Sequence, residues 1–279
     1  LDARRSLLQT EDEQTAGFMA RILVSTISGK TQEAMLADCD LYASEEICQK
    51  VETGVQRLLN QEPLAYVLGE WEFYGLRLYV DKNVLIPRDD TCAVADLAIR
   101  QGLFLDKDPR VLDLCCGSGC IGLAIAQRVK DARVTLADVS RDALAVAKKN
   151  ITRHKLSARV SCVQADALQP ASSFLGKFDM IVSNPPYITG EEMKELPRSV
   201  AEYEPHLALY GGEDGLDFYR FIAAKWKTAL RLGGTLIFEV GIGQAPAVEE
   251  ILAMNGYEDI KTTIDTGEIW RVVEGTINS

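Results

Sequence analysis

Four consecutive residues, Asn184-Pro185-Pro186-Tyr187, combine side chains that suit one kind of chemistry. They follow the run Phe178-Asp179-Met180-Ile181-Val182, which is typical of a buried parallel strand. Two prolines in a row have no backbone N–H to give to a sheet, so they stop that strand. A core strand therefore ends abruptly at an amide, two rigid rings and a phenol.

These side chains suit the transfer of a methyl group to an amide or aromatic-amine nitrogen. The lone pair of such a nitrogen is delocalised, so its attack depends on how the NH₂ group is oriented. The side-chain oxygen of Asn184 and the carbonyl of Pro185 are neutral acceptors for that NH₂ group. The paired prolines keep the acceptors in place, and the Tyr187 ring packs on the planar group. We therefore take Asn184, Pro185 and Tyr187 as the candidate catalytic residues.

A glycine-rich stretch, Asp113-Leu114-Cys115-Cys116-Gly117-Ser118-Gly119-Cys120-Ile121-Gly122, indicates a cofactor site. It follows one candidate strand, opens a helix and contains G-x-G-x-x-G. Glycines let the backbone approach a ligand closely, and the helix start offers free N–H groups. The pattern predicts an adenosine-bearing cofactor, although a tight strand-to-helix turn alone gives the same pattern.

Acidic residues at neighbouring strand ends narrow the choice of cofactor. Asp138 ends the second strand, where a carboxylate accepts both hydroxyls of a ribose, and Asp166 ends the third, where it receives the adenine amino group. Asp113, just before the glycines, suits the amino group of a methionine moiety and disfavours a pyrophosphate. Together with the Asn-Pro-Pro-Tyr segment, this favours S-adenosylmethionine over a nicotinamide.

Alternating strands and helices after residue 110 bring these motifs together. The candidate strands are Val111–Leu114, Val134–Ala137, Val160–Val163, Phe178–Val182, Thr235–Val240, Ile260–Ile264 and Trp270–Val273. Helical stretches lie near 119–129, 140–150, 216–231 and 244–254. The alternation predicts a parallel sheet with helices on both faces, and the Asp265-Thr266-Gly267-Glu268 turn predicts a final hairpin. Ligands bind at the carboxyl ends of such strands.

The first 68 residues have a different pattern. Ser44 is a candidate N-cap for a helix through Leu59, and Phe18 to Ile27 predicts another amphipathic helix. Trp71 to Val80 predicts two short strands around a glycine turn. We therefore expect a helical domain at 1–68, a β-hairpin linker at 69–90 and a cofactor-binding catalytic domain at 91–279.

Composition sets the remaining expectations. The net charge of −11 argues against nucleic acid as a partner. The sequence has no run of about 18 apolar residues, so we expect no membrane span. Its first residues also lack a signal-peptide pattern. Seven cysteines without framework spacing predict free thiols and a cytoplasmic location. Cys115, Cys116 and Cys120 have no fourth ligand near them in sequence, so we expect no metal.

The chain resembles a known family over nearly its whole length. The family is that of the protein-(glutamine-N5) methyltransferases of class 1 peptide-chain release factors, the HemK/PrmC type. The segments that carry the resemblance are Glu62-Pro63-Leu64-Ala65-Tyr66-Val67-Leu68-Gly69, Glu72-Phe73-Tyr74-Gly75, Val84-Leu85-Ile86-Pro87-Arg88, Asn184-Pro185-Pro186-Tyr187-Ile188, Tyr203-Glu204-Pro205-His206-Leu207-Ala208-Leu209 and Gly211-Gly212-Glu213-Asp214-Gly215-Leu216 with Tyr219-Arg220.

The resemblance implies a seven-stranded Rossmann-like class I methyltransferase domain with a small N-terminal helical domain. It implies methylation of the glutamine in a Gly-Gly-Gln loop, with S-adenosylhomocysteine as product, and helices at 1–68 that dock the release factor. The implied substrate-binding residues are Asn184, Pro185, Pro186 and Tyr187. With the acids named above, the cofactor-binding set is Asp113, Cys115, Cys116, Gly117, Ser118, Gly119, Asp138, Asp166, Ala167 and Asn184.

The sequence departs from the family pattern at two places, and other functions share part of it. Cys115 stands where the family usually has glycine, and Cys116 replaces a small polar residue. Residues 87–92 lack a second proline and a final acid, but keep Arg88, which either pairs with acids near the site or is solvated. Glutamine methylation of a ribosomal protein, adenine-N6 or guanine-N2 methylation of nucleic acid, and a non-catalytic cofactor-binding module are the alternatives.

Overall fold

The chain folds into two compact units. The computed structural model describes residues 2–37, 43–105 and 108–278. The first unit is Leu1–Trp71 together with Pro197–Tyr203, and the second is Glu72–Leu196 together with Glu204–Ser279. Residues 38–42 of the expected helical domain lie outside the described residues.

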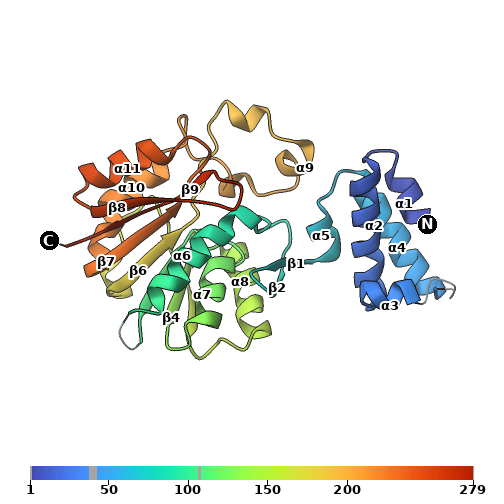
Figure 1. Cartoon of the computed structure of the whole chain (residues 1–279), viewed down its shortest axis with the longest axis horizontal. Helices are drawn as coiled ribbons and strands as arrows, with labels where there is room; N and C mark the ends of the chain where they lie inside the picture. Colours follow the sequence, from blue (N-terminus) through green and yellow to red (C-terminus); the bar gives the residue numbers. More distant parts are fainter. Residues whose placement is uncertain (1, 38–42, 106–107, 279) are drawn as a thin grey trace. The chain divides into compact units, whose positions relative to one another are not determined.

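The first unit is helical (Figure 1). Its helices are α1 (Asp2–Leu7), α2 (Glu13–Ser28), α3 (Gln32–Ala37), α4 (Glu45–Leu59) and α5 (Leu64–Leu68). Ser44 caps α4 by accepting the N–H of Ile47 at 3.3 Å, so the predicted cap is confirmed. The apolar faces of α2 and α4 pack so closely that a Cβ on Gly54 would lie 2.8 Å from the Leu23 side chain.

A distant segment also belongs to this helical unit. It contains the short helix α9 (Arg198–Ala201), and the hydroxyl of Tyr203 donates to the carbonyl of Asn60 at 2.8 Å. No pattern in the sequence predicted this return of the chain.

The predicted hairpin after the helices is confirmed. Strands β1 (Glu70–Phe73) and β2 (Leu76–Tyr79) form a two-stranded sheet. Tyr74 and Gly75 turn the chain with φ of 53° and 74°, as a tight hairpin turn requires.

A seven-stranded sheet forms the centre of the second unit. Its strands are β3 (Arg110–Leu114), β4 (Arg133–Asp138), β5 (Val160–Gln164), β6 (Phe178–Ser183), β7 (Leu230–Glu239), β8 (Glu258–Ile264) and β9 (Trp270–Thr276). Their order is β5-β4-β3-β6-β7-β9-β8. The first five strands are parallel, and β9 pairs antiparallel with both β7 and β8, which confirms the predicted sheet and its final hairpin.

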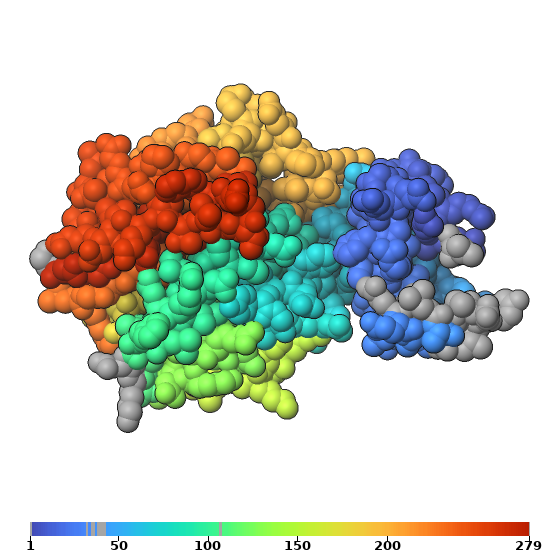
Figure 2. Space-filling view, viewed as in Figure 1, coloured from blue at the N-terminus to red at the C-terminus, as the bar shows by residue number. Residues whose placement is uncertain are grey.

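Helices cover both faces of this sheet (Figure 1). On one face, α6 (Cys92–Gly102), α7 (Cys120–Arg128) and α8 (Arg141–Arg153) share one apolar core. On the other, α10 (Asp217–Lys225) and α11 (Ala245–Met254) share a second core. The sequence prediction missed α6. Side chains close the spaces between these ribbons into a continuous surface (Figure 2).

Short 3₁₀ turns complete the second unit. They are η1 (Asp89–Thr91), η2 (Ser173–Leu175), η3 (Glu192–Lys194), η4 (His206–Ala208) and η5 (Trp226–Ala229). Among the described residues, no helix is long and apolar enough to cross a membrane.

The register of two central strands sets the position of the site. Leu114 of β3 pairs with Ser183 of β6, and the Ser183 hydroxyl donates to the Leu114 carbonyl at 2.7 Å. The loops that begin at Cys115 and Asn184 therefore start side by side. The strand order reverses here, because β4 lies on one side of β3 and β6 on the other.

Candidate active site

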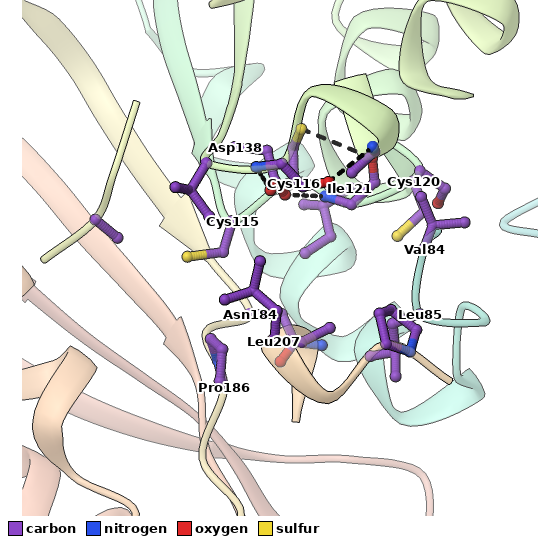
Figure 3. A pocket seen from close by; sticks show the side chains of 18 of the residues that line it. Val84, Leu85, Cys115, Cys116, Cys120, Ile121, Asp138, Asn184, Pro186 and Leu207 are labelled. Carbon is purple, nitrogen blue, oxygen red and sulfur yellow. Dashed lines mark hydrogen bonds between the residues drawn. The ribbon is translucent and has the colours of Figure 1, made fainter. Parts of the chain in front are cut away.

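A cavity of about 260 Å³ opens where β3, β4, β5 and β6 end. Figure 3 shows Cys115 and Asp138 on one side of Asn184, and Val84 and Leu85 across from them. The wall consists of Asn83, Val84, Leu85, Pro87, Arg88 and Thr91, residues 115–118, Cys120 and Ile121, residues 138–140 and Ala143, residues 165–168, Asn184 and Pro186, Pro205, Leu207, Ala208, and Phe218.

The glycine-rich loop forms one wall of the cavity. Its Gly117 N–H donates to Oδ2 of Asp138 at 2.9 Å, and the Cys116 N–H donates to the Ala137 carbonyl at 3.0 Å. Gly119 has a φ of 82°, and a Cβ there would lie 2.8 Å from Leu136. Glycine is therefore required at this position both for backbone conformation and for packing.

Cys115 occupies a backbone conformation that favours glycine. Its φ is 63°, in the left-handed region that costs other residues about 1–2 kcal/mol. Glycine would adopt this conformation without strain, whereas Cys115 adopts it with strain. Burial raises the pKa values of the Cys115, Cys116 and Cys120 thiols, so they are neutral side chains.

Two predicted acids lie in the cavity wall. Asp138 ends β4, and its Oδ1 accepts the Ser140 N–H at 2.9 Å. Burial raises the pKa of Asp138. Asp166 is half-buried, accepts the Leu168 N–H at 2.8 Å and lies beside the buried Ala167. Each oxygen keeps a free lone pair that a ligand hydroxyl or amino group can use.

Asp113 is placed differently from the other predicted cofactor residues. It is 1% exposed and does not line the cavity; its Oδ2 accepts the Gly122 N–H at 2.8 Å. Its Oδ1 is buried without a hydrogen-bond partner. Burial raises its pKa to about 7. Asp113 therefore fastens the loop to the first turn of α7, and direct contact with a cofactor stays a prediction.

The Asn-Pro-Pro-Tyr loop forms the facing wall. The Asn184 side-chain Nδ2 donates to the Thr91 hydroxyl at 3.3 Å, and Pro186 lines the cavity. Pro185 and Tyr187 do not line it, and neither does Gly119 from the first loop. The Tyr187 hydroxyl instead donates to Oε1 of Glu239 at 3.5 Å, and burial raises its pKa.

Glycines from a distant segment support this second loop. A Cβ on Gly211 would lie 2.6 Å from the Pro186 carbonyl oxygen, and one on Gly215 would lie 2.3 Å from that of Tyr187. Gln244 Nε2 donates to the Tyr187 carbonyl at 3.0 Å. Gly211 and Gly215 are therefore needed because the backbone of residues 186–187 lies directly against them.

Arg88 pairs with an acid near the site, one of the two outcomes expected from the sequence. It forms an ion pair with Glu204, whose side chain is 1% exposed and which also accepts the Ile86 N–H at 3.2 Å. This pair fastens the segment around residue 86 to the start of the 204–208 segment, and both segments border the cavity.

Three residues of the site were missed by sequence reasoning. Thr91 lines the cavity; Glu239 is a buried charged residue at the end of β7; and Asn150 is fully buried in α8. Asn150 Nδ2 donates to the carbonyls of Ser118 and Tyr79 at 3.0 and 3.1 Å, which joins the glycine-rich loop to the hairpin. A polar residue at an apolar position was the available signal for Asn150 and Glu239.

Comparisons with known proteins agree with this architecture. The family model "PrmC N-terminal domain" matches residues 1–69, and "Methyltransferase small domain" matches residues 99–207. The chain is 37% identical to a release factor glutamine methyltransferase of Clostridium acetobutylicum, over 96% of this chain and 94% of that protein. It is 38% identical to one of Geobacter sulfurreducens, over 99% and 95%. A methyltransferase from Pyrococcus furiosus shares the fold, with a TM-score of 0.53 at 18% identity over 79% of this chain and 96% of that one.

The fold and the position of the cavity define a methyltransferase of the class I, Rossmann-like type. Within that class, the similarity over nearly the full length of both chains is decisive. The protein belongs to the release factor glutamine methyltransferase family.

Proposed function

We propose that this protein transfers a methyl group from S-adenosylmethionine to the side-chain nitrogen of the glutamine in the Gly-Gly-Gln motif of class 1 release factors. One observation carries the proposal. The orienting amide, Asn184, lines the same cavity as the glycine-rich loop and the acids at the ends of β4 and β5. A donor site and an amide-binding site formed by these residues would share one space, as direct transfer requires.

The residues present fit S-adenosylmethionine. Asp138 would hold the ribose hydroxyls, and Asp166 with Ala167 would border the adenine, whose amino group suits a carboxylate acceptor. The Ser118 hydroxyl lines the cavity, is buried, and has no hydrogen-bond partner in the described structure, so it is available to a ligand. When bound, this cofactor supplies an electrophilic methyl group.

The chain's own residues would bind and orient the glutamine. With Nδ2 of Asn184 engaged by Thr91, its Oδ1 is left to accept a hydrogen bond from the glutamine amide. The carbonyl of Pro185 would accept the other N–H, and the buried proline pair keeps both acceptors rigid. The nitrogen becomes strongly acidic after attack, so its proton leaves without a histidine base.

The substrate is tested by competition among acceptors. The protein is mixed with labelled cofactor and, in turn, release factor, ribosomal proteins and RNA. We expect label on the release factor only. A release factor with Glu in place of the glutamine should take no label, because a carboxylate has no N–H to hold. Label on a ribosomal protein or on RNA would replace this substrate with one of the alternatives.

The helical unit is proposed as the docking surface for the release factor. A Gly-Gly-Gln loop alone offers little area, whereas specific protein pairs usually bury more than about 1,000 Å². We expect the KM of the full-length protein to be at least about tenfold lower for intact release factor than for a short Gly-Gly-Gln peptide, a difference of about 1.4 kcal/mol. Equal KM values would remove the docking role. A cytoplasmic location is proposed from the cysteine pattern alone.

A further inference from the structure

Asn150 is a buried amide that hydrogen-bonds the backbone of two segments far apart in the sequence. It lies in α8, is 0% exposed and does not line the cavity. Its Nδ2 donates to the Ser118 carbonyl at 3.0 Å and to the Tyr79 carbonyl at 3.1 Å, and its Oδ1 accepts the Tyr79 N–H at 2.6 Å. An amide supplies two donors and an acceptor at once, so the side chain satisfies all three backbone groups.

One of these segments is the glycine-rich loop. Ser118 lines the cavity, and its buried hydroxyl has no hydrogen-bond partner in the described structure. Gly117 and Gly119 on either side of it have φ values of 52° and 82°. Glycines have the most conformational freedom to lose on folding, so the loop sequence alone fixes this peptide weakly. The bond from Asn150 to the Ser118 carbonyl therefore supplies an anchor from outside the loop.

The other segment leads to the facing wall of the cavity. Tyr79 ends β2, and a tight turn follows in which Oδ1 of Asp81 accepts the Asn83 N–H at 2.9 Å and the Asp81 carbonyl accepts the Val84 N–H at 3.1 Å. Residues 83–85 line the cavity, and Val84 and Leu85 lie across from the start of the glycine-rich loop (Figure 3). The turn therefore connects the position of Tyr79 to the position of this wall.

We propose that Asn150 is a positioning residue that holds these two walls in the arrangement that binds S-adenosylmethionine. The inference rests on the cofactor proposed above and adds the residue that preforms its site. Without Asn150, the Ser118 carbonyl and the backbone groups of Tyr79 would lose a buried partner, so the loop would move to find others. Binding would then include the cost of ordering the loop again, and affinity would fall.

The test measures the dissociation constant of S-adenosylmethionine by calorimetry on the full chain. Asn150→Leu has a similar size and removes all three hydrogen bonds, whereas Asn150→Asp keeps the acceptor and, when ionised, has no donor. We expect the dissociation constant to rise at least about tenfold in both variants, while kcat at saturating cofactor stays within about threefold.

The outcomes separate this inference from the proposed function. A wild-type protein that does not bind S-adenosylmethionine would overturn the proposed function and the inference with it. A wild type that binds, together with both variants at an unchanged dissociation constant, would overturn the positioning role alone.

Hydrogen exchange tests the connection in the wild type, without any variant. Residues 76–82 do not line the cavity, so S-adenosylhomocysteine reaches them only through the structure. We expect its binding to slow amide exchange in this stretch more than in β8, at the far edge of the sheet. The extra slowing should be absent from Asn150→Leu at saturating ligand. Equal effects on both stretches in the wild type would overturn the proposal.

Two control variants separate positioning from a general loss of structure. His154, one turn further along the same helix, donates from Nε2 to the Arg77 carbonyl of β2 at 2.9 Å, so His154→Ala loosens the strand without removing the bond to the loop. Tyr257 is 4% exposed and donates its hydroxyl to the Ala223 carbonyl at 3.3 Å, so Tyr257→Phe removes a buried hydrogen bond elsewhere. Both should keep the dissociation constant within about twofold of the wild type, which is under about 0.5 kcal/mol. A tenfold rise in either control would attribute the effect to stability and overturn the proposal.

Discussion

Two loops border the cavity, and each lies above a buried carboxyl group. Asp113 lies beneath the glycine-rich loop and Glu239 behind the Asn-Pro-Pro-Tyr loop; both are 1% exposed, and burial raises both pKa values to about 7. Each has one oxygen without a hydrogen-bond partner, Oδ1 of Asp113 and Oε2 of Glu239. They differ in where their partners come from.

Asp113 accepts a hydrogen bond from a residue of its own sequence motif, whereas Glu239 accepts one from a residue far away in the sequence. The partner of Asp113 is the N–H of Gly122, nine residues later. Glu239 accepts a hydrogen bond from the Tyr187 hydroxyl, 52 residues earlier in the chain. A backbone partner fixes a loop regardless of its side chains, whereas a hydroxyl partner fixes the orientation of a particular side chain. The first carboxyl therefore holds the shape of its loop, and the second holds the Tyr187 side chain.

The largest expected effect tests the second loop. Asn184→Ala removes the amide that we propose orients the substrate, so turnover should fall on the order of 10²–10³-fold, as for other preorganised polar groups. Cofactor affinity, measured by calorimetry, should change far less. Turnover near that of the wild type would show that the second loop does not orient the substrate, and the proposed difference in role between the two loops would be wrong.

The next effect tests the first loop. Asp138→Ala removes the proposed ribose acceptor and the partner of the Gly117 N–H, so S-adenosylmethionine binding should weaken by roughly 1.5–3 kcal/mol. The effect should appear in the dissociation constant of the cofactor, while kcat at saturating cofactor changes less. An unchanged dissociation constant would contradict the assigned site.

The pH dependence of stability compares the two carboxyl groups directly. A raised pKa means that the folded state holds a proton which the unfolded state releases, so stability is lost as pH rises from about 4 to about 7. Each group contributes at most about 1.4 kcal/mol per pH unit. Asp113→Asn and Glu239→Gln should each flatten the fall in urea-unfolding free energy over this range. A variant whose curve runs parallel to that of the wild type would show that its carboxyl has an ordinary pKa.

The same contrast explains what the sequence could predict. The sheet, its final hairpin and the glycine-rich loop follow from local periodicity and turn residues, and the structure confirms them. The second loop was recognisable from its prolines, but Thr91, Glu239 and the supporting Gly211 were not. Their roles arise only after the chain has folded, because they meet residues 184–187 from separate elements. The return of residues 197–203 to the helical unit was unpredictable for the same reason.

The smallest expected effect concerns the strain at the start of the first loop. Cys115 and Cys116 are adjacent, but only Cys115 has a positive φ, 63°. Replacing each cysteine with Gly and with Ala removes the thiol in both cases and isolates the backbone preference. At position 115, Gly should be more stable than Ala by about 1 kcal/mol, because a Cβ is strained in the left-handed region.

At position 116 the order should reverse, with Ala more stable than Gly by roughly 0.5–1 kcal/mol, since glycine loses more conformational entropy on folding. Thermal unfolding of the four variants measures both differences. Opposite signs at adjacent positions would show that the first loop is fixed by its backbone, as its local hydrogen bonds suggest. Ala equal to or better than Gly at both positions would mean that Cys115 is unstrained and that the loop has no preference for glycine at its start.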